Sequence, residues 1–517
     1  MKAGVKGVQD LEYEIGFTAG KNSSGHFQFV ISENADIKKW EYVGLNINGS
    51  IVIGRIEDIV SKSDLMDESI DYESIKRYTE NKINDSTNMS YVNVLGRLEN
   101  DNLVQSREII TPGLKVYKLS SAILKKLFSF PDEESLYIGN LPDTGVPVSI
   151  NIKGMRRHLA ILAQTGAGKS HTASVIMEEL LKKGASIIVL DPHADYVFMK
   201  KDRDGKIYSD NIDVFRTPLS TGRYSRDDIG IIKEFTIRFQ DLTADDIKGI
   251  MGIKDNYTQM SPLIDDILKA MKGKKDLNDF MNTAEKLPQD DYRKIKGRLV
   301  FLEKIREIFS DYTTGIKDYL GPGKMSVLDL SGMDQYLANY FSFRILSEIY
   351  DSKISSEFKY PVFIFVEEAH NFVPPRVNSN IAGMIKKIAA EGRKFGIFLT
   401  VITQRPGKID ADVLSQCNSQ IILRVTNPID QNAILQSSEN ITESLMEDLP
   451  SLDTGEAIIV GEIVKMPVII KVRDRETKPG GSDIDIISLL KEARDEVRKM
   501  NNPDEIKKKN KNLLGDF

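Results

Sequence analysis

Residues 157–170 read Arg-His-Leu-Ala-Ile-Leu-Ala-Gln-Thr-Gly-Ala-Gly-Lys-Ser, and the organisation of the chain follows from them. An apolar run of strand-forming residues ends in a glycine-rich turn, and a helix is expected to begin at the Lys-Ser pair. Strand, turn and helix in this order are typical of a phosphate-binding P-loop, in which backbone N–H groups at a helix N-terminus face the phosphates. The stretch therefore predicts a nucleoside triphosphate site.

The predicted P-loop departs from the usual pattern at one position. Ala163 stands where the first glycine of G-x-x-x-x-G-K-[ST] is usual, and alanine fits there as long as its φ is negative. Lys169 is expected to reach the β- and γ-phosphates, and the Ser170 hydroxyl is expected to hold Mg²⁺. The predicted nucleotide-binding residues are Gln164, Thr165, Gly166, Ala167, Gly168, Lys169, Ser170 and His171.

The composition indicates the general class of protein, but it does not identify a binding partner. The chain has 517 residues, of which 41% are hydrophobic and 28% charged, as in an ordinary globular protein of two to four domains. Its single cysteine, Cys417, excludes an internal disulfide and a cysteine-based zinc cluster. No apolar run is long enough for a transmembrane span, and Met1–Asp10 lacks the apolar centre of a signal peptide, so we expect a cytoplasmic protein without a membrane anchor. A net charge of −6 argues against a broadly basic surface, whereas a DNA-threading motor needs positive charge only along its channel.

Residues 1–149 are predicted to form a small antiparallel β-barrel. They contain many short β-like segments separated by turn signals such as Asn48-Gly49, and they lack helical periodicity. The polar stretch 61–90 interrupts this pattern and is expected to be a helical or flexible excursion. The expected strands include His26–Ile31, Ser50–Ile56, Tyr91–Leu98 and Leu114–Leu119.

Buried strands alternate with helices from residue 150 onward, which predicts a parallel α/β sheet. We expect a RecA-like ATPase core in residues 150–220 and 321–478, interrupted by a helical insertion at 221–320. The expected insertion helices are Ile229–Phe239, Leu263–Met271 and Tyr292–Phe309. A polar extension, 479–517, closes the chain, with one helix near 486–497. Its last lysines, 507–511, predict a solvated tail, with DNA contact as the alternative.

Two acidic residues follow the apolar strand expected at 362–366. In P-loop ATPases a carboxylate at this strand end lies beside Mg²⁺, and its neighbour polarises the attacking water. We assign Glu367 to the metal, through a water molecule, and Glu368 to the catalytic base. Aspartate is commoner than glutamate at the first of these two positions.

Polar residues also end two other expected strands. Gln404 follows the strand near 397–402 and is predicted to sense the γ-phosphate or to orient the water. Asp191 and His193 end a strand on the same side of the sheet, where ligands bind in open parallel sheets. For these two residues, support of the P-loop or the Mg²⁺ shell and direct contact remain equally open.

In order, these motifs resemble the HerA family of hexameric DNA translocases, within the HerA/FtsK group of motor ATPases. The resemblance covers nearly the whole chain. It is carried by 157–170, Asp191–Tyr196, Phe365–Phe372, Glu391–Phe395, Thr403–Pro406 and Gly455–Gly461.

The resemblance implies a homo-hexamer with ATP and Mg²⁺ at the subunit interfaces and double-stranded DNA in the channel. It also implies a partnership with a NurA-type nuclease in DNA end resection for recombinational repair. Taken alone, Arg393 would be assigned to the C-terminus of its helix. The resemblance instead makes Arg393 a finger that acts on the neighbouring subunit, and Arg157 a second arginine that interacts with nucleotide.

Three alternatives stay open from the sequence. One is a conjugative-transfer or chromosome-partition pump, and another is a nucleotide-dependent clamp or scaffold that recruits a nuclease without moving along DNA. The third concerns Arg376, in the loop after the glutamate pair, which is either a DNA backbone contact or part of a plain surface loop. Translocation polarity, step size and the choice between six and seven subunits do not follow from the sequence.

Overall fold

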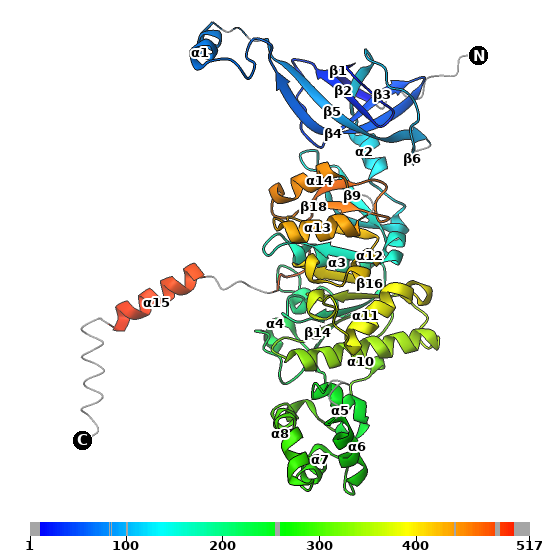
Figure 1. Cartoon of the computed structure of the whole chain (residues 1–517), viewed down its shortest axis with the longest axis vertical. Helices are drawn as coiled ribbons and strands as arrows, with labels where there is room; N and C mark the ends of the chain where they lie inside the picture. Colours follow the sequence, from blue (N-terminus) through cyan, green and yellow to red (C-terminus); the bar gives the residue numbers. More distant parts are fainter. Residues whose placement is uncertain are drawn as a thin grey trace.

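The computed structural model describes residues 11–81, 83, 85–99, 102–253, 259–438, 441–480 and 486–500. The chain is elongated: a β-barrel lies at one end, a large sheet covered by helices lies in the middle, and a helical bundle lies at the other end (Figure 1). This is the predicted architecture, a RecA-like α/β core with a helical insertion behind an N-terminal barrel. No helix among the described residues is long and apolar enough to cross a membrane.

The barrel closes because the strand at one end of the sheet also pairs with a long strand near the other end. The strand order is β2-β1-β7-β3-β4-β5-β6, and β2 also pairs with β5. Asn48 (φ 52°) and Gly49 (φ 86°) form the tight turn of the β3–β4 hairpin, since both adopt the left-handed conformation that such turns require. The expected excursion contains the helix α1, Tyr72–Glu80. The strands are β1 Leu11–Ala19, β2 His26–Ile31, β3 Tyr42–Ile47, β4 Ser50–Lys62, β5 Thr87–Glu99, β6 Asn102–Val104 and β7 Lys115–Leu119.

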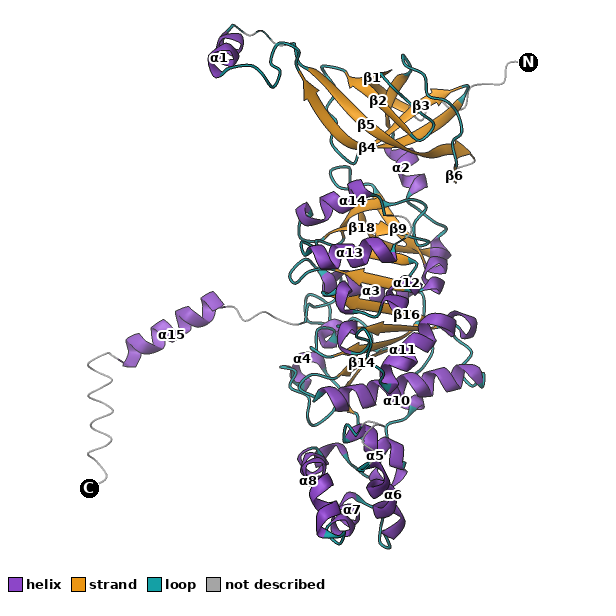
Figure 2. Ribbon diagram, in the orientation of Figure 1, coloured by secondary structure: helices purple, strands orange, loops and turns teal. Residues whose placement is uncertain are grey.

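The central sheet has the order β13-β12-β14-β11-β15-β16-β10-β17-β18-β19-β8-β9. From β13 to β17 all neighbours are parallel, and from β17 onward they are antiparallel. Helices cover both faces (Figure 2), so the inner parallel strands are continuously apolar and buried. The strands are β8 Ser135–Asn140, β9 Pro147–Asn151, β10 Leu159–Leu162, β11 Ser186–Asp191, β12 Ile212–Arg216, β13 Ile232–Glu234, β14 Met325–Asp329, β15 Val362–Val366, β16 Ile397–Thr403, β17 Ser419–Ile422, β18 Glu456–Val460 and β19 Val468–Val472.

The helices beside the sheet connect these strands. The P-loop helix α3 follows β10, and α10 and α11 flank the strand that ends at the glutamate pair. Their bounds are α2 Ser121–Leu127, α3 Lys169–Lys182, α10 Gln335–Ile354, α11 Asn380–Glu391, α12 Ala411–Gln416, α13 Pro428–Ser437 and α14 Glu443–Asp448.

Two sequence predictions need correction. The hairpin β8–β9, expected in the barrel, pairs instead with β19 of the central sheet, because its apolar residues share the core of the P-loop strand. The stretch Ile229–Phe239, expected as a helix, contains only the end of the short helix α4, Arg226–Ile229. Gly230 (φ 84°) ends that helix, and the next residues form the edge strand β13 beside β12. These residues form a strand because the backbone of β12 is available as a partner for hydrogen bonding at the edge of the sheet.

The remaining helices form two separate parts. Those of the insertion bury one apolar centre that includes Ile264, Phe280 and Ile295. They are α5 Ala244–Ile250, α6 Ser261–Ala270, α7 Leu277–Ala284, α8 Gln289–Lys304 and α9 Ile316–Tyr319. The helix α15, Ile486–Met500, lies apart from the rest of the chain (Figure 1). The lysine-rich residues 507–511 lie outside the described residues.

Candidate nucleotide site

The P-loop joins β10 to α3 with the backbone turned toward open space. Gly166 (φ 77°) and Gly168 (φ 109°) adopt left-handed conformations, and no atom stands within 4 Å of where a Gly166 side chain would be. Helix α3 begins without a side-chain cap, so its first N–H groups face the loop. Ala163, at the unusual position, is fully buried with a negative φ, and its methyl group packs in the core. The missing glycine is thus accommodated without strain.

Lys169 reaches from α3 to both glutamates at the end of β15. Its Nζ donates to Glu367 Oε1, and it lies 2.8 Å from Glu368 Oε1. Although burial disfavours the ammonium, the two carboxylate charges raise the pKa of Lys169. Burial raises the pKa of Glu367, whose carboxylate also accepts a hydrogen bond from the Tyr196 hydroxyl. One ammonium group therefore stabilises two neighbouring buried carboxyl groups.

Glu368 is held in a conformation that its side chain does not favour. Its backbone lies in the left-handed region, with φ 49° and ψ 47°, which is uncommon for a residue other than glycine and concentrates at functional sites. Its Oε2 is buried, 3.2 Å from His370 Nδ1, and lacks a well-formed hydrogen bond among the described residues. Burial favours the neutral form, but His370 and Lys169 lower the pKa of Glu368 to about 2. Glu368 is therefore an ionised carboxylate, with Oε1 against Lys169 and Oε2 against His370.

Gln404 lies directly beside the P-loop. It follows β16, which pairs with β10, and its Oε1 accepts a hydrogen bond from the Thr165 hydroxyl. Gln164 and His171 make different contacts. Gln164 Oε1 accepts from the Thr426 hydroxyl at 2.8 Å, and His171 Nε2 lies 2.8 Å from the Arg473 carbonyl oxygen. The structure thus brings Gln404 to the phosphate loop, whereas it turns His171 toward the segment that follows β19.

The loop after β11 contains a carboxylate that the sequence did not single out. Asp195 Oδ2 accepts a hydrogen bond of 3.0 Å from the Ser170 hydroxyl. Asp191 instead accepts backbone N–H groups of Asp195 at 3.0 Å and Tyr196 at 2.9 Å, so it shapes this loop. His193 is exposed on its far side, away from the P-loop contacts. The sequence does contain a signal for Asp195: it is a second acidic residue, four positions after Asp191, the acid that ends β11.

The two candidate arginines lie at the N-terminal ends of the sheet strands, whereas the P-loop lies at the C-terminal ends. Arg157 precedes β10, and Arg393 precedes β16, whereas the P-loop and Gln404 follow these strands. Arg157 pairs with Glu462 at 2.6 Å, and both side chains are about half exposed. Arg393 is exposed and makes no ion pair within the described part of the chain. Neither arginine reaches the P-loop of its own chain, and Arg376 (φ 60°) is exposed in the loop before α11.

The donors in this site suit a magnesium nucleotide. A hydroxyl and carboxylates are the ligands that Mg²⁺ prefers, and Ser170, Asp195 and Glu367 supply them beside the P-loop. No group of three or more His, Cys, Asp or Glu side chains is arranged to hold a metal among the described residues. Binding would therefore depend on phosphate oxygens as well as the protein, as is usual for Mg²⁺ in such sites.

His158 connects the P-loop strand to its neighbour as a neutral ring. It is 2% exposed, its Nδ1 accepts the Leu399 N–H at 2.9 Å, and its Nε2 donates to the Ala389 carbonyl at 3.0 Å. Burial, reinforced by the charge of Arg393, lowers the pKa of His158 to about 4. Protonation of Nδ1 would remove the bond to Leu399.

This geometry predicts a pH dependence of stability. The neutral ring contributes fully above the unfolded-state pKa of about 6.5, and its contribution is lost as the pH falls toward 4, by about 3 kcal/mol in the free energy of unfolding. Urea unfolding midpoints between pH 7 and pH 4 would measure the loss. His158→Gln, which does not titrate, should show a shallower fall over the same range. An equal slope in both proteins would contradict the assignment.

The family described as "HAS barrel domain" matches residues 15–116, and the one described as "Helicase HerA, central domain" matches residues 136–349. The DNA double-strand break repair helicase HerA of Sulfurisphaera tokodaii is 30% identical over 504 residues, covering 93% of this chain and 97% of that protein. This chain belongs to the HerA family. The probable HerA of Methanocaldococcus jannaschii is also 30% identical, covering 90% of this chain and 97% of that relative.

The chain was also compared with solved structures. VirB4 of Thermoanaerobacter pseudethanolicus aligns with a TM-score of 0.46 at 16% identity, covering 67% of this chain and 98% of that one. The HAS barrel match ends at residue 116 and the HerA central-domain match begins at residue 136, so the second match includes nearly all of β8, which the structure places in the central sheet.

Proposed function

We propose that this HerA family member is an ATP-driven motor that translocates double-stranded DNA as a hexameric ring and works with a NurA-type nuclease in DNA end resection for recombinational repair. The observation that carries the proposal is Lys169, held between Glu367 and Glu368 where β10 and β15 end. That arrangement joins the phosphate-binding half of an ATPase site to its hydrolytic half. The named HerA relatives, which are DNA double-strand break repair helicases, support the choice of DNA as the substrate on which the motor acts.

The residues of the site divide into binding and hydrolysis. The N–H groups from Gly166 to Ser170 and the Lys169 ammonium would bind the phosphates, and the Ser170 hydroxyl would hold Mg²⁺, with Glu367 acting on it through a water molecule. When bound, magnesium ATP supplies the phosphoanhydride bond and the divalent charge beside it. Glu368 orients the attacking water and accepts its proton. We expect Lys169 to move from the carboxylates to the phosphates as nucleotide binds, which frees Oε1 of Glu368.

The position of the arginines supports the proposal that the protein acts as a ring. A finger stabilises the charge that develops as the phosphoanhydride bond breaks, so it must reach the γ-phosphate. Arg393 and Arg157 lie at the far edge of their own sheet, and a head-to-tail ring would place that edge against the P-loop of the next subunit. Arg393 is therefore assigned to the finger, and Arg157 to a second contact across the same interface. Gln404, beside Thr165, senses the γ-phosphate.

DNA binding in the channel is proposed to act through the phosphate backbone. Arg376 is exposed in the loop that joins the glutamate pair to α11, which connects it along the chain to the ATP site. Contact with backbone phosphates makes movement independent of base sequence. The nuclease is proposed to dock at the barrel end of the ring.

An experiment separates the motor from a clamp that only binds. With ATP, the full-length chain should displace a third strand from a triplex placed along duplex DNA, because a translocating ring removes a bound obstacle. Lys169→Ala should leave the third strand in place. Displacement that is absent with ATP, even when the partner nuclease is added, would contradict translocation and favour the clamp.

A further inference from the structure

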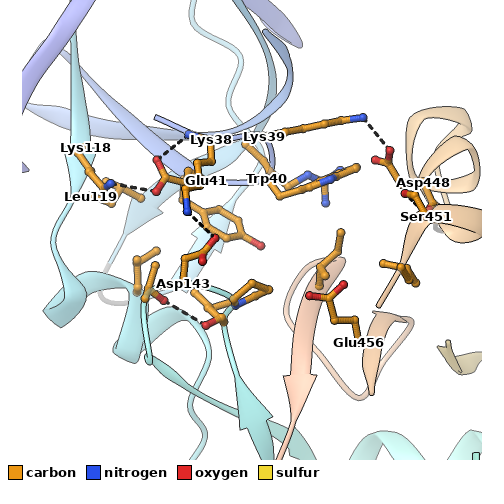
Figure 3. Close-up of a pocket in the computed structure, with 18 residues that line it drawn as sticks. Lys38, Lys39, Trp40, Glu41, Lys118, Leu119, Asp143, Asp448, Ser451 and Glu456 are labelled. Atoms are coloured by element: carbon orange, nitrogen blue, oxygen red, sulfur yellow. Dashed lines mark hydrogen bonds and ion pairs between the residues drawn. The ribbon is translucent and has the colours of Figure 1, made fainter. Parts of the chain in front are cut away.

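A cleft separates the barrel from the central sheet, with a volume of about 350 Å³. Trp40 lies in it, the only tryptophan of the chain, and adopts a left-handed backbone conformation (φ 76°). Its indole packs against the core of the ATPase domain, and the Lys39 ammonium and the Arg55 guanidinium lie 5.1 Å and 4.8 Å from its ring centre. Figure 3 shows Lys39 extended above Trp40 toward Asp448. An aromatic side chain of the barrel is thus fixed against the motor by two cations.

Both cations bind the ATPase domain directly. Lys39 Nζ donates to Asp448 Oδ1 at 2.8 Å, at the end of α14 (Figure 3). Arg55 is 1% exposed, and its Nη1 donates to the Pro467 carbonyl at 3.1 Å, one residue before β19. A buried guanidinium without partners costs free energy, so the hydrogen bond to the Pro467 carbonyl stabilises this contact between the barrel and the ATPase domain. The barrel therefore contacts two chain segments, the one after α14 and the one that becomes β19.

These two segments meet at the P-loop. Residues 449–455 lead from α14 to Gly455, whose N–H donates to the Ala167 carbonyl of the P-loop at 3.0 Å. The far end of β19 holds the same turn: the Val472 N–H donates to the Gly455 carbonyl at 2.9 Å, and Lys471 Nζ donates to the Thr454 carbonyl at 2.7 Å. The backbone of Gly455 also lies against Gly168, 3.5 Å from where a side chain would begin.

The segment is stiff enough to transmit a displacement. Leu445, Leu449 and Leu452 anchor it in the core with at most 5% exposure. The Ser451 hydroxyl donates to the Asp448 carbonyl at 2.9 Å, and the Asp453 N–H donates to Glu456 at 2.9 Å. Packed interiors transmit strain because they contain few voids. A shift of the Ala167 carbonyl would therefore reach Asp448 and the cleft.

We propose that residues 448–456, which we call the junction segment, couple the P-loop to the barrel, with Lys39, Trp40 and Asp448 as positioning residues. Nucleotide binding at the P-loop changes the contacts of Trp40, and the barrel contact in turn tunes nucleotide affinity, since coupling between two sites is reciprocal. This coupling rests on the proposed function, because it requires nucleotide at the P-loop. It gives the motor a route by which a partner on the barrel senses the state of the ATP site.

The lone tryptophan makes the coupling measurable. The full-length chain is titrated with a non-hydrolysable ATP analogue and Mg²⁺, while Trp40 emission is recorded and binding is measured separately by competition with a fluorescently labelled nucleotide. We expect the emission change to saturate with the dissociation constant found by competition. Lys39→Met and Asp448→Asn should reduce the emission change at saturation by more than half, and weaken nucleotide binding about threefold, the scale of one partly exposed ion pair.

The neighbouring lysine supplies a matched control. Lys38 lines the same cleft but pairs with Asp143 at 3.2 Å, outside the junction segment. Lys38→Met should leave both the emission change and the affinity as in the wild type. Saturated binding without an emission change, or a full change in Lys39→Met and Asp448→Asn, would overturn the coupling and leave the proposed function standing. Absence of binding in the competition measurement would overturn the proposed function, and the coupling with it.

Discussion

Glu368→Gln should lower the rate of ATP hydrolysis about 10³-fold and leave nucleotide affinity within a few-fold of the wild type. The amide keeps the size of the side chain and still accepts one hydrogen bond from Lys169, but it does not accept a proton. Glu368 is suited to the role because His370, 3.2 Å from its Oε2, helps to keep the carboxylate ionised after Lys169 has moved to the phosphates. Single-turnover hydrolysis together with labelled-nucleotide binding would separate the two effects.

A matched variant guards against a general effect of removing a carboxylate. Glu357 lies on the exposed loop before β15, at the opposite end of that strand from Glu368. Glu357→Gln should hydrolyse ATP at the wild-type rate. Rates that stay within tenfold of the wild type in Glu368→Gln would show that another group accepts the proton, and Asp195, hydrogen-bonded to Ser170, would be the next residue to replace.

The convergence of Lys169, Glu367, Glu368 and Gln404 could be predicted from the sequence for a geometric reason. Each of these residues follows a buried apolar strand, and in a parallel sheet the carboxyl ends of all strands share one edge. The same reasoning places Arg157 and Arg393, which precede strands, at the opposite edge. The predicted strand positions are therefore enough to tell which candidate residues lie at the P-loop side of the sheet and which lie at the opposite side.

Features that depend on contacts distant in sequence could not be predicted in this way. The hairpin β8–β9 has the same short alternating pattern as a barrel strand, and only the open edge of β19 decides where it pairs. The edge strand β13 likewise depends on β12 as a partner. Asp195 sits in a loop whose shape is set by hydrogen bonds to the buried Asp191, which no local pattern encodes.

The junction segment shows the same limit for long-range coupling. Gly455–Gly461 is one of the motifs that carry the family resemblance, and the sequence pattern of residues 1–149 predicts a separate barrel domain. Their connection requires Lys39 to meet Asp448, 409 residues later, and Gly455 to meet Ala167. Because a side-chain pair so distant in sequence leaves no periodic signal, only the folded chain reveals it.

Arg393→Ala should lower the ATPase activity of the assembled protein by about 10³-fold or more, the range found for arginine fingers. The arginine is exposed and lies at the opposite sheet edge from its own P-loop, so the loss should arise at a neighbouring subunit. Lys394, the next residue on the same turn, is also exposed and offers a control with the same loss of one charge. Lys394→Ala should retain most of the activity.

Mixing subunits tests the direction of this contact. Arg393→Ala subunits keep an intact P-loop, and Lys169→Ala subunits keep an intact finger. Where a Lys169→Ala subunit presents Arg393 to the P-loop of an Arg393→Ala subunit, one complete site forms, so the mixture should hydrolyse ATP faster than either variant alone. A mixture no more active than the two separate proteins, when both still assemble, would place the action of Arg393 within its own chain. That result would also remove the main structural reason for a ring. Arg157, the other arginine proposed to act across the interface, is already paired with Glu462.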